Sequence, residues 1–212
     1  MKKVANGILT VVTVMIMGGC ANTSNVNMSH PLTKVSTSYV KILKQNCDAN
    51  IAKDCNLLAY SYNTGKNIRQ DYSLAVQYYT KAISLGDSDS YINLAWLFDK
   101  GLGIKKNYYM AAKLYEKASL YDSDKGVRNE ARYNLGLHYS DGKGVKQSYF
   151  KAAKLYRKAC DNKYYTACNN LGLLYDYGKG VRQSRTKAKR LYGKACDGGV
   201  NLGCKNYARL NR

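Results

Sequence analysis

The residues with the clearest potential for chemistry are cysteines, of which the chain has seven. Cys20 stands apart near the amino terminus, and the other six form three pairs in which seven residues separate the partners. The pairs are Cys47 with Cys55, Cys160 with Cys168, and Cys196 with Cys204. In an exported protein, an even number of cysteines at one repeated spacing indicates disulfides. Six cysteines can pair in fifteen ways, and the common spacing favours three local bridges.

A metal site is the rival interpretation of these pairs. Zinc ligands within a pair usually lie about two to four residues apart, which is closer than the spacing found here. The chain has only two histidines, His30 and His138, and we expect His138 on the surface of a helix. The sequence therefore predicts neither a metal site nor a cofactor.

Two Ser-x-x-Lys tetrads, at 148–151 and 184–187, could support nucleophilic catalysis. Penicillin-recognising enzymes place a serine and a lysine one helical turn apart in this way, but their S-D-N and K-T-G partner motifs are absent. The equivalent position in two further copies of an internal repeat holds Asp71 and Asn107. Asp, Asn and Ser are the residues that cap helix amino termini. We therefore predict that the two serines are helix caps.

Four copies of this repeat organise most of the chain: 56–91, 92–132, 133–168 and 169–204. Three copies have 36 residues, and the second has five more. In the first half of each copy, a leucine, a small residue and an aromatic residue stand at i, i+1 and i+4: Leu58, Ala59 and Tyr62; Leu94, Ala95 and Phe98; Leu135, Gly136 and Tyr139; Leu171, Gly172 and Tyr175. In the second half, Ala, Tyr and Ala stand at i, i+4 and i+7: Ala75, Tyr79 and Ala82; Ala111, Tyr115 and Ala118; Ala152, Tyr156 and Ala159; Ala188, Tyr192 and Ala195.

Each half of the repeat has the spacing of one apolar stripe on a helix, so each copy is predicted to form a helix–turn–helix unit. A single hairpin cannot bury its own stripe, and the units must therefore stack as a solenoid. The cysteines fall at the end of one unit and the start of the next, where a bridge would join consecutive hairpins. The middle units carry Ile83 with Tyr91, and Ser119 with Arg132, at these positions and must rely on packing.

The run YNLGLHYSDGKGVKQSYFKAAKLYRKACDNKYYTAC at 133–168 resembles a Sel-one-like repeat, in the cysteine-rich variant of secreted Helicobacter proteins. The resemblance implies an all-α, right-handed superhelical solenoid over residues 39–212, related to tetratricopeptide arrays. It also implies protein–protein contact or a peptidoglycan-associated role. Some cysteine-rich relatives have been described as penicillin-binding proteins or weak β-lactamases, so the resemblance implies a β-lactamase-like hydrolase as the alternative function.

Residues 1–19 have the pattern of an export signal: a basic start, an apolar run and then small residues. The apolar run, 8–17, is shorter than the roughly 20 residues that span a bilayer. Gly18-Gly19-Cys20 resembles the bacterial lipobox, in which the cysteine is lipidated, and Ala21 favours the outer membrane, with the protein facing the periplasm. Without lipidation at Cys20 the protein would be secreted. Residues 20–38 are rich in Asn, Ser and Thr and are predicted to be a flexible tether.

The first helices of such an array line its concave face, where ligands commonly bind. One repeat position on these helices is always asparagine: Asn93, Asn134, Asn170 and Asn206. By resemblance to tetratricopeptide arrays, this asparagine can bond the backbone or carboxylate of an extended peptide. The alternative is that it caps the start of the helix. Trp96, the only tryptophan, should face the same groove as an aromatic anchor.

The net charge is +20, and residues 133–212 hold 17 lysines and arginines against four acids. This surplus is either a solvated exterior or an attraction to an anionic partner. Nucleic acid is disfavoured as a partner by the export signal. The sequence thus predicts an envelope lipoprotein scaffold that binds a protein or peptide, possibly acidic, or peptidoglycan. The alternative is a penicillin-binding or weak β-lactamase protein.

Overall fold

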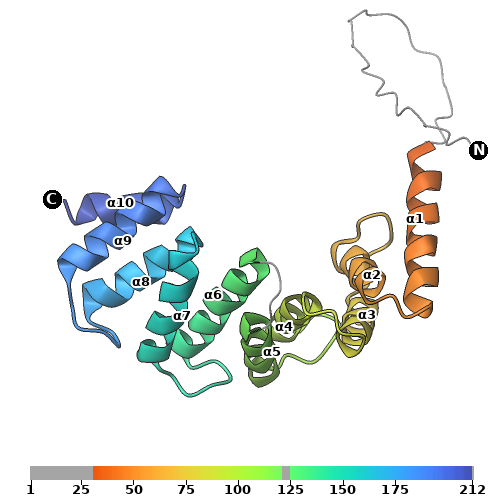
Figure 1. The fold of residues 1–212 in the computed structure, drawn as a ribbon, viewed down its shortest axis with the longest axis horizontal. Coiled ribbons are helices and arrows are strands. Elements are labelled where there is room, and N and C mark those ends of the chain that lie inside the picture. Colours follow the sequence, from red (N-terminus) through yellow and green to blue (C-terminus); the bar gives the residue numbers. More distant parts are fainter. Residues whose placement is uncertain (1–30, 121–124, 212) are drawn as a thin grey trace, which may run out of the picture. The chain divides into compact units, whose positions relative to one another are not determined.

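The computed structural model describes residues 31–120 and 125–211, and every regular element in these ranges is an α-helix (Figure 1). The helices of these ranges are α1 (Pro31–Asp48), α2 (Ala52–Thr64), α3 (Tyr72–Ser84), α4 (Ser90–Lys100), α5 (Tyr108–Leu120), α6 (Lys125–Asp141), α7 (Tyr149–Asp161), α8 (Tyr165–Tyr177), α9 (Arg185–Asp197) and α10 (Asn201–Arg209). From α2 to α10, each helix packs against the next one in the chain. The predicted all-α repeat array is therefore confirmed.

The chain before α1 holds several of the predicted features. The predicted signal at 1–19, Cys20 and the first part of the tether lie outside the described residues. Helix α1 begins at Pro31, so residues 31–38, which the composition assigned to the tether, are helical instead. Proline is well suited to a first helical turn, because the N–H it lacks has no partner there. In the described ranges, no helix is both long enough and apolar enough to cross a membrane.

The repeated tyrosines of the second helices form the centre of the array. Tyr79, Tyr115, Tyr156 and Tyr192 are all buried. Each packs near the small residue of a first helix, and in the last two units that residue is glycine. A Cβ atom added at Gly136 would lie 2.5 Å from the ring of Tyr156, so the absence of a side chain lets the two helices approach.

The turns of the α4–α5 and α6–α7 hairpins also touch the preceding unit. Gly103 has a φ of +67°, and a Cβ there would lie 2.2 Å from the carbonyl carbon of Tyr72, at the start of α3. Gly144 repeats this contact against Tyr108, at the start of α5. Only glycine combines this backbone conformation with so close an approach. The Gly-x-Gly steps therefore join neighbouring units.

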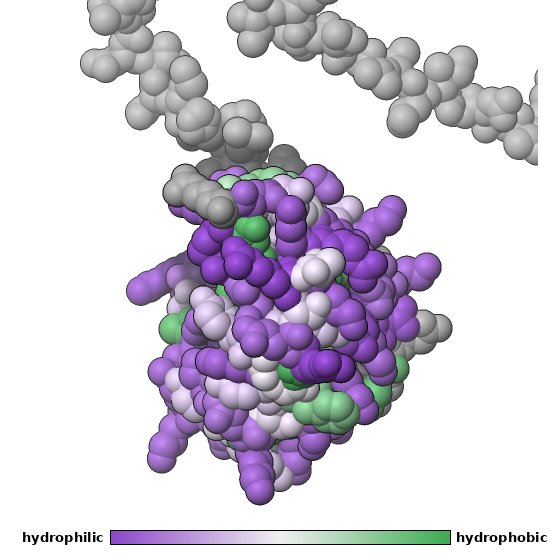
Figure 2. All heavy atoms as spheres, turned by 90° about the vertical axis from the view of Figure 1, so that its left-hand side faces the viewer, coloured by the Kyte–Doolittle hydropathy of each residue, from purple (hydrophilic) through white to green (hydrophobic). Residues whose placement is uncertain are grey.

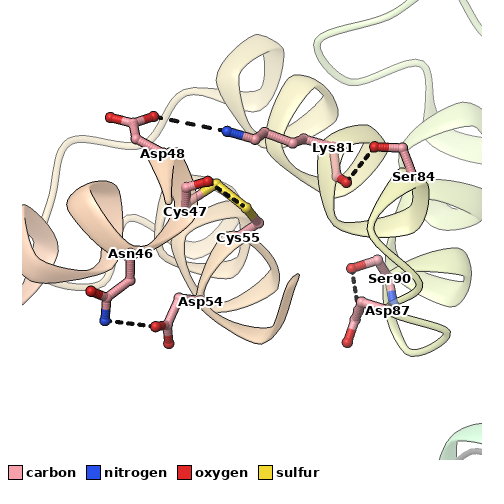
Figure 3. The surroundings of a disulfide bond; sticks show 9 residues. All are labelled: Asn46, Cys47, Asp48, Asp54, Cys55, Lys81, Ser84, Asp87 and Ser90. Carbon is pink, nitrogen blue, oxygen red and sulfur yellow. Dashed lines mark hydrogen bonds and ion pairs between the residues drawn. A yellow bond between two sulfur atoms is a disulfide. The ribbon is translucent and has the colours of Figure 1, made fainter. Parts of the chain in front are cut away.

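All three predicted disulfides are present. Cys47–Cys55 joins α1 to α2, and the equivalent bridges join α7 to α8 and α9 to α10. Around Cys47–Cys55, the Asn46 amide donates to Asp54 over 2.7 Å, and Lys81 of α3 lies 4.0 Å from Asp48 (Figure 3). Cys160–Cys168 thus joins two consecutive hairpins, and the other two bridges join the terminal helices α1 and α10 to the hairpins beside them. Such bonds form and persist in oxidising compartments, which supports an exported environment.

The junction between α3 and α4 has a polar clip in place of a bridge. Asp87 accepts hydrogen bonds from the backbone N–H and the hydroxyl of Ser90, at 2.9 and 2.5 Å (Figure 3). Both residues are buried. Ile83 and Tyr91, which occupy the cysteine positions, are partly buried against the flanking clusters.

Candidate binding face

The serines of the two Ser-x-x-Lys tetrads are helix caps, as predicted. Ser148 accepts a hydrogen bond from the backbone N–H of Lys151 over 3.3 Å, and Ser184 accepts the same bond from Lys187. Asp71 and Asn107 cap α3 and α5 in the same way, over 3.0 Å. The four residues share one structural role, because they stand where each second helix begins.

The lysines of these tetrads contact tyrosine rings. The Nζ atom of Lys151 lies 5.0 Å from the ring centroid of Tyr139, and that of Lys187 lies 5.4 Å from the centroid of Tyr175. A cation over an aromatic face is an attractive pairing. The serines are thus occupied as caps and the lysines lie over tyrosine rings, an arrangement that lends no support to the penicillin-binding alternative.

The first helices carry two neighbouring hollows. The α4–α6 hollow has a volume of about 280 Å³ and includes Asn134 in its lining. The α6–α8 hollow has a volume of about 550 Å³ and includes Asn170. Leu137 and Asp141 belong to both linings, so the hollows adjoin on one side of the array. We call this side, with Asn134, Asn170 and the two hollows, the first-helix face.

Asn170 is tied into the α6–α8 hollow by two tyrosines. Burial raises the pKa of Tyr133 and of Tyr156, and a hydrogen bond from Asn170 opposes the rise in both. Asn170 also accepts from the Asn169 amide over 3.3 Å. Its side chain is half-buried, with one side on the core tyrosines and the other in the hollow.

The remaining predicted groove residues lie on the same helices but outside the two linings. Asn206 donates to Asn169 over 2.9 Å and so joins α10 to α8. Asn93 is half-buried, and Trp96 is 38% exposed. The structure thus brings Asn134 and Asn170 to hollows, while Asn93, Trp96 and Asn206 do not line them.

The alternative in which these asparagines cap the first helices is wrong. The N-cap positions of α4, α8 and α10 are Asp89, Tyr164 and Val200, and each asparagine lies inside its helix. Sequence spacing placed the asparagines near the helix starts, but α4, α8 and, above all, the longer α6 begin earlier than the spacing indicated.

His138 is buried, which corrects the expected surface position. Its Nδ1 lies 2.8 Å from the carbonyl oxygen of Lys143, and its Nε2 lies 3.2 Å from a carboxylate oxygen of Asp99. Because a carbonyl oxygen only accepts, Nδ1 is the donor in the first contact. The rings of Tyr108 and Tyr115 flank the imidazole. His138 therefore connects α4, α5 and the α6–α7 turn around the α4–α6 hollow.

Sequence reasoning missed several residues of the face. Tyr149, Tyr177 and Gln147 line the α6–α8 hollow. The glutamine carried a signal, because Gln70, Gln147 and Gln183 recur at one repeat position, and each donates to a carbonyl of the preceding first helix over 2.7 to 2.8 Å. Tyr149 also carried a signal, because Tyr72, Tyr108 and Tyr149 share one repeat position, whereas Tyr177 is the only tyrosine at its repeat position.

The end of the array that carries α9 and α10 is strongly polar (Figure 2). Figure 2 views the end of the array that carries α9 and α10, where hydrophilic residues cover most of the surface and hydrophobic ones form small patches. Within the described ranges, no group of three or more metal-ligating side chains comes together.

Comparison with known proteins identifies the repeat. The family model for the Sel1 repeat matches residues 52–87, 88–120, 129–164 and 166–200. Each matched copy corresponds to one hairpin of the structure. The gap between the second and third copies contains the extra residues of the longer unit. A search of curated proteins gave no match.

Solved structures of other proteins share this fold. A Sel1 repeat protein from Oxalobacter formigenes is 26% identical, with a TM-score of 0.70, and the match covers 84% of this chain and 74% of that one. The c5321 protein, a protective antigen of uropathogenic Escherichia coli, is 24% identical, with a TM-score of 0.66 over 81% of this chain and 43% of that one. Helicobacter pylori cysteine rich protein B is 26% identical over 66% of this chain and 97% of that one, with a TM-score of 0.49.

Proposed function

Since the chain belongs to the Sel1 repeat family, we propose that it is an exported scaffold that binds an extended segment of a protein or peptide along its first-helix face. Proteins built from Sel1 repeats typically serve as protein-interaction scaffolds. The observation that carries the proposal is the pair of adjoining hollows with one asparagine in each, one repeat apart.

The chemistry of the hollows suits a peptide backbone. An asparagine amide offers both a donor and an acceptor, which is what a peptide group requires. Between the two asparagines, Leu137 and Leu173 supply apolar surface, and Tyr149 and Tyr177 supply aromatic surface with hydroxyl groups. Aromatic side chains of this kind are frequent anchors at interfaces.

The charge of the first-helix face is mixed. Lys100, Lys106 and Lys143 line the α4–α6 hollow together with Asp99 and Asp141. Because three lysines outnumber two aspartates there, the hollow would attract a peptide with acidic side chains. Its recognition would therefore combine amide contacts with a moderate electrostatic attraction that salt weakens.

The test begins with a partner identified by crosslinking in the native envelope. That partner is then titrated against the wild type, the Asn134→Ala/Asn170→Ala variant and the control Asn162→Ala, which changes an exposed asparagine that bonds only within the end of α7. The proposal expects the double variant to lose at least about tenfold in affinity, with the control unchanged. Two lost amide contacts of about 1 kcal/mol each give a loss of this size.

A second ionic strength separates the asparagines from general charge. At about 0.5 M salt the wild type should keep most of its advantage over the double variant, because neutral hydrogen bonds are little screened. If affinity collapses equally for every variant at high salt, binding belongs to the basic surface and the first-helix face is not the site.

We also propose that the scaffold is held at the membrane by a lipid on Cys20, after export directed by residues 1–19. The apolar run and the Gly-Gly-Cys sequence support this proposal. Labelled palmitate should enter the wild type and not Cys20→Ser, and Cys20→Ser should leave the membrane fraction while keeping its helical circular dichroism. A Cys20→Ser protein that still takes up label contradicts the proposal.

A further inference from the structure

A separate hollow lies on the second helices, between α5 and α7, with residues of α6 in its lining. This α5–α7 hollow has a volume of about 650 Å³. Five cations line it against one acid, Glu116: Arg132, Lys151, Lys154, Arg157 and Lys158. Such a surplus of positive charge in one concavity favours an anionic ligand.

The hollow lies where a disulfide would be expected from the repeat. Ser119 and Arg132 occupy the two cysteine positions at the junction of α5 and α6, and both line the hollow. At the equivalent position one unit later, Cys160 and Cys168 are bonded to each other. Of the two junctions between described hairpins that have no bridge, this one belongs to the unit with the extra residues, and the basic hollow lies at the position of the missing bridge.

Apolar surface accompanies the cations. Leu135 and Leu155 lie in the lining, together with Leu120, which is 76% exposed. On the same helices, Phe150 is 57% exposed, and the ammonium of Lys154 lies 4.4 Å from its ring centroid. Lysines beside exposed aromatic and aliphatic side chains are the pattern of a surface that meets both headgroups and acyl chains.

We propose that the α5–α7 hollow binds the phosphate headgroup of an anionic phospholipid. Lys151, Lys154 and Lys158, with Arg132 and Arg157, would surround the phosphate, and Leu120 and Leu155 would contact the acyl region. The surplus of cations is the reason for proposing an anion, and the exposed apolar side chains are the reason for proposing a lipid. The site shares no lining residue with the first-helix face, so it stands or falls independently of peptide binding.

The test is a calorimetric titration of the full chain with dihexanoyl phosphatidylglycerol below its micelle concentration. Dihexanoyl phosphatidylcholine has the same chains without net charge, and glycerol phosphate has the anion without chains. The proposal expects phosphatidylglycerol to bind at least about tenfold more tightly than either, because both the charge and the apolar part contribute. Equal binding of the two lipids, or of glycerol phosphate and phosphatidylglycerol, would overturn it.

Two matched variants locate the site. Lys151→Gln/Lys154→Gln removes two cations of the hollow, and Lys187→Gln/Arg190→Gln removes two exposed cations at the same repeat positions of α9. The first variant should lose about tenfold or more in affinity for phosphatidylglycerol, and the second less than about twofold. Equal losses would assign the binding to net charge alone. Displacement of the lipid by a hexaglutamate peptide that binds more tightly would assign the hollow to acidic protein instead.

Discussion

The first-helix face and the α5–α7 hollow are built on the same repeat core, but their side chains differ in chemistry. The first-helix face combines neutral amides and phenols with both signs of charge. The α5–α7 hollow combines five cations with one acid. The difference shows that the leucine, alanine and tyrosine stripes determine the fold, while the positions between them are free to specialise. The predictions below test whether stability depends on the core stripes and not on the side chains of the two faces.

The largest effect should come from alkaline pH, which acts on all four units at once. Burial raises the pKa of Tyr79, Tyr115, Tyr156 and Tyr192 above the ordinary value of 10.0. In the unfolded chain these phenols ionise near pH 10, while in the fold they stay neutral. The stability they contribute is complete below pH 10 and is lost as the pH rises further.

Circular dichroism melts between pH 8 and pH 12, with phenolate absorbance recorded in parallel, measure this effect. Unfolding should coincide with the ionisation of the buried tyrosines. If the free energy of unfolding is unchanged up to about pH 12, the buried tyrosines do not stabilise the fold that carries both faces.

Leu135→Ala should have the next largest effect. Leu135 is 4% exposed and belongs to the core cluster between α4 and α6, so its truncation should cost about 2–5 kcal/mol. Leu120→Ala is the control, because that side chain is largely exposed and its loss should change stability by no more than about 0.5 kcal/mol. Thermal melts of both variants give the answer, and similar melting temperatures would contradict the assignment of Leu135 to the core.

Removing one bridge should have a smaller and localised effect. Cys160→Ser/Cys168→Ser opens a loop of nine residues, which costs at most about 2.5 kcal/mol in the chain-entropy model. Hydrogen exchange should show lower protection in α7 and α8, while α3 and α4, which already lack a bridge, should change little. If protection falls equally along the array, the stability of a unit does not depend mainly on the units next to it.

The helix caps should give the smallest effect on stability. Ser148→Ala and Ser184→Ala should each cost about 1 kcal/mol, because each removes one acceptor from the first turn of a second helix. Chemical denaturation measures the change, and Ser148→Thr should restore most of it. Hydrolysis of a chromogenic β-lactam by the wild type that disappears in Ser148→Ala would support the enzyme alternative.

The sequence predicted the features that depend on local spacing. The helix caps, the three bridges and the buried stripes each depend on residues within a single unit or at one junction, and their periodicity made them visible. The start of α1 was missed, because a polar composition concealed a helix that begins at Pro31.

Apart from the three bridges, contacts between units could not be predicted. His138 looked like a surface residue on its own helix, and its burial depends on Asp99 of α4 and Tyr115 of α5. The position of the asparagines inside their helices was likewise missed, because no sequence feature fixed the starts of α4, α6 and α8. The α5–α7 hollow has no sequence signature beyond the absence of two cysteines.

The most direct test of the central claim is site-specific photocrosslinking in the native envelope. Tyr177 lines the first-helix face and is 61% exposed. Phe150 on α7 is 57% exposed and lies against Lys154, a residue of the α5–α7 hollow. Each is replaced in turn by a photoreactive phenylalanine, a conservative change at an exposed aromatic position. The account predicts one discrete protein adduct from position 177 that weakens in Asn134→Ala/Asn170→Ala, and no protein adduct from position 150. A protein adduct from position 150 alone, or the same adduct from both positions, would contradict it.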